Sequence, residues 1–173
     1  ANPDAYIASH GADSLRAYLM FMGPLEDKKP WNPQGIEGVY RFLRKVWREL
    51  VGPGPDLLPK IKPDPQADSP ETLRLLHETI RKVRSDYANI RFNTALSQLM
   101  IFLNHAGKES ALSVATARSF IQLLAPLAPH LAEEAWQRFG GTGSVAFAPF
   151  PEHDPEWLKA DEVTIGLLVN GKA

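Results

Sequence analysis

The sequence predicts an all-α protein: an antiparallel helical bundle, preceded by short connecting helices and followed by a small C-terminal extension that begins a strand. Three observations lead to this prediction. Apolar residues recur at spacings of three and four through several long segments. Proline and glycine stand at the breaks between these segments. The connections are short or moderate in length, which favours antiparallel packing.

Two short helices are predicted at the N-terminus. The first begins at Pro3 and ends near Gly11, because proline suits the first turn of a helix and glycine suits its end. The second covers residues 12–23 and is stopped by Gly-Pro. A loop rich in proline and charge follows. We assign residues 1–32 to a connecting region.

The segment GIEGVYRFLRKVWREL, residues 35–50, is strongly amphipathic. Its helix is expected to start after Asn32 and Pro33 and to end at the run VGPGPDLLP. Helical spacing predicts an apolar stripe of seven residues: Ile36, Val39, Tyr40, Leu43, Val46, Trp47 and Leu50. Four cations fall together on the opposite face: Arg41, Arg44, Lys45 and Arg48.

The later helices are predicted from their end signals. Ser69, Pro70 and Glu71 supply a cap, a first-turn proline and an acid at the positive end of the helix dipole. Three further helices are expected: one capped by Asn93 and ended by Gly107, one from about Ser110 to Leu124, and one from Pro129 to Phe139.

Residues 33–141 should therefore form one bundle. We expect eight apolar residues to share its core: Leu43, Trp47, Leu76, Ile80, Leu99, Leu103, Leu124 and Trp136.

Residues 142–173 differ in character from the bundle. A loop and an acidic linker lead to the strand-like run VTIGLLVNGKA. Asn170-Gly171 is a strong hairpin signal, yet only two residues follow it. We interpret this segment as a linker and the truncated start of a C-terminal region, and the chain as a piece of a longer protein.

Composition excludes several classes of protein. Lys plus Arg number 19 against 20 Asp plus Glu, so a surface for polyanions must come from local clustering. There is no apolar run long enough for a membrane span, the first residues lack the basic and apolar segments typical of a signal peptide, and the absence of cysteine excludes disulfides. We expect a cytoplasmic protein with no membrane partner.

Catalytic and metal-binding motifs are missing. There is no P-loop, no dinucleotide-binding glycine pattern, no nucleophile elbow and no His-Glu-x-x-His. His130 precedes Glu133 and Glu134 by one helical turn, but this single copy is in the wrong order for a di-iron bundle, and an acidic pair on a helix dipole is the simpler interpretation. We predict no catalytic, cofactor-binding or metal-binding residue in this chain.

The cationic face of residues 35–50 has two interpretations. Such a face is often only solvated. However, Glu37 is the only acid near its centre, whereas the helix from Glu71 mixes its cations with acids. Arginine also suits phosphate, because its planar fork donates two hydrogen bonds.

Several motifs, in order, resemble the class Ia aminoacyl-tRNA synthetases. They are NPDAYIASHGADSLRAYLMF, WNPQGIEGVYRFLRKVW, RFNTALSQLM, LLAPLAPHLAEEAWQRFG, PFPEHD and VNGK. The Trp-x-x-x-Gly-Ile-Glu-Gly run from Trp31 to Gly38, with YRFLRKVW, is most similar to the bacterial leucyl-tRNA synthetases. The resemblance covers nearly the whole chain.

The resemblance implies that this segment follows the KMSKS loop of a catalytic domain and contains the anticodon-binding-type helical bundle. Its partners would be leucine-specific tRNA and the catalytic and C-terminal domains of the parent chain. Leucyl enzymes resemble one another in not reading the anticodon bases, so the bundle should grip the tRNA body, with Arg41, Arg44, Lys45 and Arg48 facing phosphates. The parent would ligate leucine to tRNA using ATP, but the HIGH and KMSKS motifs are absent here.

Two alternatives stay open. The bundle could be a purely structural spacer between the catalytic and C-terminal domains, with its cations merely solvated. A stand-alone helical enzyme is disfavoured by the missing motifs.

Overall fold

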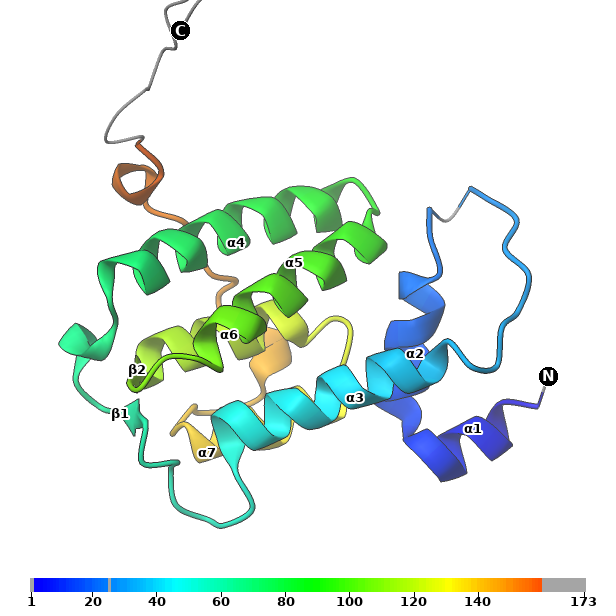
Figure 1. The fold of residues 1–173 in the computed structure, drawn as a ribbon, viewed down its shortest axis with the longest axis horizontal. Helices are drawn as coiled ribbons and strands as arrows, with labels where there is room; N and C mark the ends of the chain where they lie inside the picture. Colours follow the sequence, from blue (N-terminus) through cyan, green and yellow to red (C-terminus); the bar gives the residue numbers. More distant parts are fainter. Residues whose placement is uncertain (1, 25, 160–173) are drawn as a thin grey trace, which may run out of the picture.

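The computed structural model describes residues 2–24 and 26–159, and these form a helical bundle (Figure 1). Its helices are α1 (Pro3–His10), α2 (Ala12–Phe21), α3 (Ile36–Val46), α4 (Pro70–Ala88), α5 (Phe92–Ala106), α6 (Val114–Leu124) and α7 (Pro129–Arg138). A π-helical turn, Trp47–Val51, continues α3, and 3₁₀ turns occupy Pro65–Ala67, Val145–Phe147 and Pro155–Leu158. The predicted all-α bundle is confirmed.

One small feature of the fold was not predicted. The two-residue strands β1 (Ile61–Lys62) and β2 (Leu112–Ser113) pair in parallel, with Ile61 opposite Leu112. Their pairing holds the long connection after α3 against the residues that precede α6.

The core lies between α4 and α5, which run antiparallel, and the helices α2, α3, α6 and α7 around them (Figure 1). Six of the eight predicted core residues are buried, whereas Trp47 and Trp136 are partly buried at the edge of the core. The connecting region contributes as well, because Ala17 and Tyr18 of α2 are buried in the same cluster.

Two of the predicted helix starts are wrong. α5 begins at Phe92, so Asn93 lies inside the first turn instead of capping it. α6 begins at Val114 and is capped by Ser113, whose hydroxyl accepts a hydrogen bond from Thr116 N at 3.0 Å. The predicted cap at Ser69 is confirmed, since its hydroxyl accepts from Thr72 N at 3.1 Å.

A buried carboxylate explains the late start of α6. The two oxygens of Asp68 accept hydrogen bonds from Ser113 N at 2.8 Å, from Ser113 Oγ at 2.5 Å and from Thr116 Oγ1 at 2.8 Å. These bonds hold Ser113 in extended backbone beside β1, so the helix can begin only after it.

The turn between α4 and α5 contains a left-handed residue. Ile90 has φ 58° and is 55% exposed. Its N–H donates to Tyr87 O at 3.2 Å, and Arg91 N donates to Asp86 O at 2.7 Å. A β-branched side chain is unfavourable in this conformation. At helix ends, the residue that adopts it is usually glycine and sometimes asparagine.

Residues 142–159 return across the bundle. Gln122 donates to Pro149 O at 2.8 Å, and the ring of Trp157 stacks on His77 of α4 with centroids 6.1 Å apart. The predicted strand and hairpin from residue 163 lie outside the described residues. No helix of the described part is long and apolar enough to cross a membrane.

Candidate nucleic-acid interface

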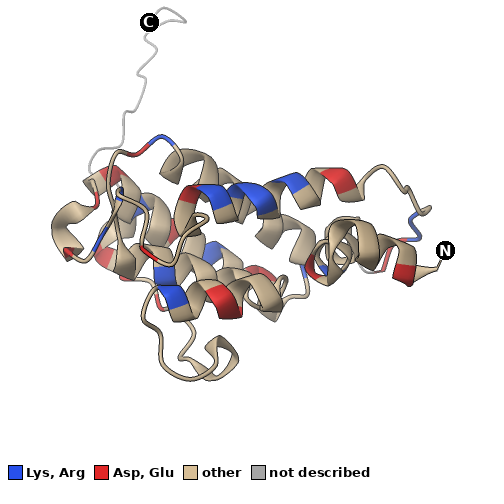
Figure 2. Ribbon diagram, turned by 90° about the horizontal axis from the view of Figure 1, so that it is seen from below, with Lys and Arg blue, Asp and Glu red and all other residues tan. Residues whose placement is uncertain are grey.

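The four predicted cations lie on the side of α3 and of its π-helical continuation that faces away from the core. Five side chains of α3 are buried against the bundle: Ile36, Val39, Phe42, Leu43 and Val46. Phe42 was missing from the predicted stripe, and Tyr40 is only partly buried. Basic residues therefore follow one another along the outside of the segment, as the bands along α3 in Figure 2 show.

The cations surround an open depression of about 630 Å³. It is lined by Arg41, Arg44, Lys45, Trp47 and Arg48. The acid near the row, Glu37, is turned toward α1, where its Oε2 lies 3.4 Å from His10 Nε2. The structure thus brings all four predicted residues to one surface, which we call the cationic row.

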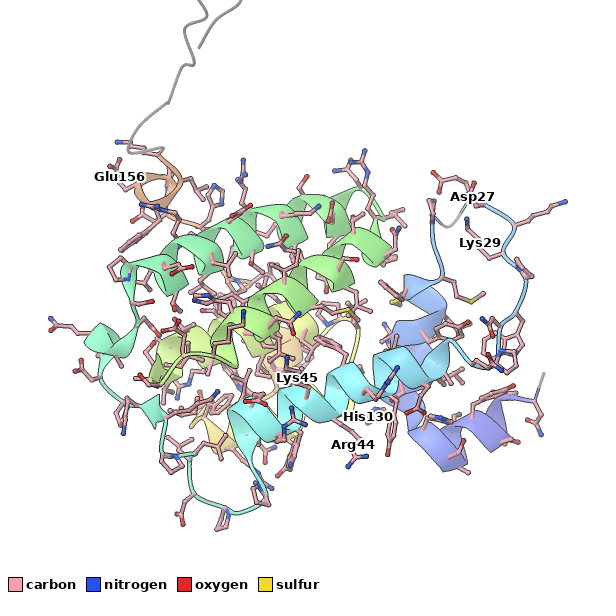
Figure 3. The ribbon with its side chains drawn as sticks, in the orientation of Figure 1. Asp27, Lys29, Arg44, Lys45, His130 and Glu156 are labelled. Atoms are coloured by element: carbon pink, nitrogen blue, oxygen red, sulfur yellow. The ribbon has the colours of Figure 1, made fainter. Side chains whose placement is uncertain are left out.

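Arg41 and Arg44 are the least engaged of the four. Arg41 is exposed and has no polar partner in the part of the chain that the structure describes. Arg44 points away from the bundle, with its guanidinium 5.7 Å from the centre of the Tyr40 ring (Figure 3). Each guanidinium group can therefore donate two hydrogen bonds to an anion without breaking an ion pair.

Lys45 and Arg48 already have partners inside the chain. Lys45 Nζ donates to Asn104 Oδ1 of α5 at 2.6 Å. Arg48 donates to Glu49 Oε1 from Nε at 3.0 Å and from Nη2 at 2.9 Å. The hydrogen bond from Arg48 is the largest influence lowering the pKa of Glu49, and Lys60, 3.4 Å away, acts in the same direction.

A π-helical turn and one arginine set the position of the far end of the row. The turn ends at Gly52, which has a φ of 84°. Arg138 of α7 lies 4.8 Å from the centre of the Trp47 ring, and it donates to the carbonyl oxygens of Gly52, at 3.4 Å, and Gly54. Arg138 therefore ties α7 to the turn that carries Arg48.

His130, Glu133 and Glu134 do not form a metal site. Each has a separate partner: His130 contacts Asp13, Glu133 accepts from Ser144, and Glu134 pairs with Arg138. The bond from Ser144 lowers the pKa of Glu133. Over residues 2–24 and 26–159, no three His, Asp or Glu side chains are grouped so that they could hold a metal ion.

Comparisons with known proteins agree on one family. Residues 71–170 match the family described as the anticodon-binding domain of tRNA ligase. A leucine–tRNA ligase of Chlorobium phaeovibrioides (strain DSM 265 / 1930) is 47% identical over 169 residues, which is 98% of this chain and 21% of that protein.

A solved structure has the same fold. It is the ternary complex of Agrobacterium radiobacter K84 agnB2 LeuRS with tRNA and LeuAMS, with a TM-score of 0.79 and 25% identity over 99% of this chain and 24% of that one. The chain thus spans between a fifth and a quarter of the length of these relatives.

Proposed function

Because the chain belongs to the anticodon-binding domain family of tRNA ligases, we propose that it is the part of a leucine–tRNA ligase that holds the tRNA body, with phosphates on the cationic row. The parent protein would use ATP to ligate leucine to its tRNA in the cytoplasm. The catalytic groups for that reaction would lie elsewhere in the parent chain. Residues 1–32, 33–141 and 142–173 would be the connecting, tRNA-binding and linker regions.

The observation that supports this proposal best is the exposed pair Arg41 and Arg44. Both lie on a helix whose opposite side is fixed in the core, so they offer their charges from a rigid support. The similar LeuRS structure was solved with tRNA. Contacts from such cations to phosphate would position an RNA without reading its sequence.

One observation favours the structural-spacer alternative. Lys45 and Arg48 are satisfied by Asn104 and Glu49, as expected of charges that serve the fold alone. Contacts made by all four cations would cause a loss of tRNA affinity of about two orders of magnitude between 50 and 200 mM salt. The spacer alternative predicts no such dependence from these residues.

The test measures the affinity of the full-length protein for leucine tRNA across this salt range. Reversing Arg41 and Arg44 to glutamate should weaken binding at low salt and flatten the salt dependence, because both phosphate contacts are lost. The single variants Arg41→Glu and Arg81→Glu form a matched pair. Arg81 is also exposed and without a polar partner in the described residues, but it lies on α4.

Helical content and melting should stay close to those of the parent, since exposed charges contribute little to stability. If Arg41→Glu and Arg81→Glu bind leucine tRNA equally well, the tRNA-binding proposal is wrong and the structural-spacer alternative is favoured.

A further inference from the structure

A second hollow adjoins the cationic row. It has a volume of about 310 Å³ and lies among α1, α2, α3 and α7. Its apolar lining includes Tyr40, Leu43, Trp47 and Leu131. Arg44 and Trp47 line both this hollow, which we call the aromatic recess, and the depression of the cationic row. An RNA strand with phosphates on the row would therefore pass the mouth of the recess.

The acids of the recess are already paired. Asp13 accepts hydrogen bonds from Leu131 N at 2.8 Å and from His130 N at 3.3 Å, and it lies 2.8 Å from His130 Nδ1. Glu134 Oε1 accepts from Arg138 Nε at 2.9 Å. Asp13 faces the positive end of the α7 dipole and Glu134 pairs with a cation, which weakens the repulsion that these acids exert on an anionic strand.

Tyr40 has the properties of a stacking residue. Its ring is partly exposed, with the Arg44 guanidinium over it and the nearly perpendicular His10 ring at a centroid distance of 5.2 Å. Its hydroxyl has no hydrogen-bond partner among the described residues. Part of this ring is therefore open to a planar group, and RNA-binding proteins stack unpaired bases on arginine planes as well as on aromatic rings.

We propose that the aromatic recess binds one unstacked base of the RNA whose phosphates lie on the cationic row, with the base stacked on Tyr40. The inference rests on the proposed tRNA binding and adds a second kind of contact to it. An apolar hollow with an aromatic wall and a cationic border complements a nucleotide, which joins a flat apolar face to a negative charge. Single-stranded and looped RNA is recognised in this way by proteins.

The experiment separates stacking from phosphate binding. Tyr40→Leu removes the ring and keeps apolar bulk, whereas Tyr40→Phe keeps the ring. In the full-length protein, Tyr40→Leu should weaken binding of leucine tRNA about tenfold, the size of effect that one base stacked on an aromatic ring produces. The salt dependence should stay as in the parent, because no phosphate contact changes. Tyr40→Phe should bind like the parent.

Dimethyl sulfate, which modifies unpaired adenine and cytosine, supplies a direct readout. The parent and Tyr40→Phe should protect one base that becomes reactive with Tyr40→Leu. Melting curves show whether each variant is folded.

The outcomes distinguish the two proposals. If Arg41→Glu weakens binding while Tyr40→Leu binds as tightly as the parent, the base-binding proposal is wrong and phosphate binding stands. If Tyr40→Leu and Tyr40→Phe weaken binding equally, stacking is also excluded. If neither Arg41→Glu nor Tyr40→Leu changes tRNA binding, the proposed function itself fails.

Discussion

Arg41 and Arg48 lie on the same helical segment but have different surroundings. Arg41 has no polar partner in the described residues, whereas Arg48 is 69% exposed and paired with Glu49. An internal carboxylate lowers the net charge that an arginine offers to a phosphate. Arg48→Ala should therefore cost the protein less tRNA affinity than Arg41→Ala does.

Removing the carboxylate should have the opposite effect. We expect Glu49→Gln to release Arg48 and to tighten tRNA binding several-fold at 50 mM salt, because the surface gains one net positive charge. Glu78→Gln, on the outer side of α4, is the control for the change in total charge. A similar gain in both variants, measured by equilibrium titration, would mean that Glu49 has no local role.

Ile90 provides a stability prediction. Its left-handed backbone is unfavourable for a β-branched residue by roughly 1–2 kcal/mol, and glycine removes this cost while adding chain entropy to the unfolded state. Ile90→Gly should raise the free energy of unfolding by up to about 1 kcal/mol in urea titrations. Ile101→Gly, at an exposed isoleucine inside α5, should lower it. A loss of stability in both variants would contradict this account.

The four cations could be predicted from helical spacing, but their partners could not. Asn104 lies 59 residues after Lys45, so only the packing of α3 against α5 brings them together. Glu49 is adjacent to Arg48 in sequence, but neighbours on an α-helix point about 100° apart. Helical spacing therefore does not predict the hydrogen bonds between these two side chains. The aromatic recess likewise depends on residues from four helices, α1, α2, α3 and α7.

Among the elements, the start of α6 depends on one buried network. Ser113→Ala would remove the cap and one of the donors to Asp68, so we expect a loss of about 2 kcal/mol in the free energy of unfolding. Asn93→Ala, at the position wrongly predicted as a cap, should cost much less. Chemical denaturation of both variants checks the difference, and equal losses would show that the network stabilises little.

Helix starts were predictable only where the signal was local. Ser69, Pro70 and Glu71 lie next to one another and identified α4 correctly. The helix expected from about Ser110 begins instead after the cap Ser113, which is held by Asp68, 45 residues before it. The late helix start is therefore a tertiary effect that spacing rules do not contain.

The contact between α4 and residues 154–159 should respond to pH. Burial lowers the pKa of His77 below its ordinary value of about 6.5. Its Nδ1 accepts a hydrogen bond from Asp154 N at 3.1 Å and must be unprotonated to do so. The neutral ring therefore stabilises the contact above about pH 6.5, and this stability is lost as the pH falls through the lowered pKa.

The indole N–H resonance of Trp157 reports this change, because the Trp157 ring stacks on His77. It should shift toward its unfolded position as the pH falls through the lowered pKa of His77. His77→Asn keeps an acceptor but removes the titration, so its Trp157 resonance should depend little on pH. An identical titration in the parent and the variant would exclude His77 as the cause.

For the molecule as a whole, the order of the motifs predicts the bundle, and residues 1–32 are assigned to a connecting region beside it. The structure shows how deeply this region enters the core, because Tyr18 is buried and its hydroxyl donates to Asn32 O at 2.6 Å. Short amphipathic helices do not reveal which neighbour covers them. The boundaries at residues 32 and 141 stay predictions.

The isolated chain should show no leucine-dependent exchange of pyrophosphate into ATP, because it lacks the HIGH and KMSKS motifs of the resembling enzymes. The full-length protein, assayed in parallel, should catalyse the exchange. Measurable exchange by a clean preparation of the chain would reveal a nucleotide site that these motifs do not describe.

The cap that Asp13 places on α7 has a consequence for synthesis. Asp13 and His130 are 117 residues apart, so during translation the acid emerges long before the backbone N–H groups that it satisfies. Until α7 leaves the ribosome, α2 lacks its contact with α7 and the nascent bundle keeps one apolar side open. We therefore expect ribosome-bound chains that end before residue 129 to be cleaved readily by protease, and chains that expose α7 to become resistant in a single step.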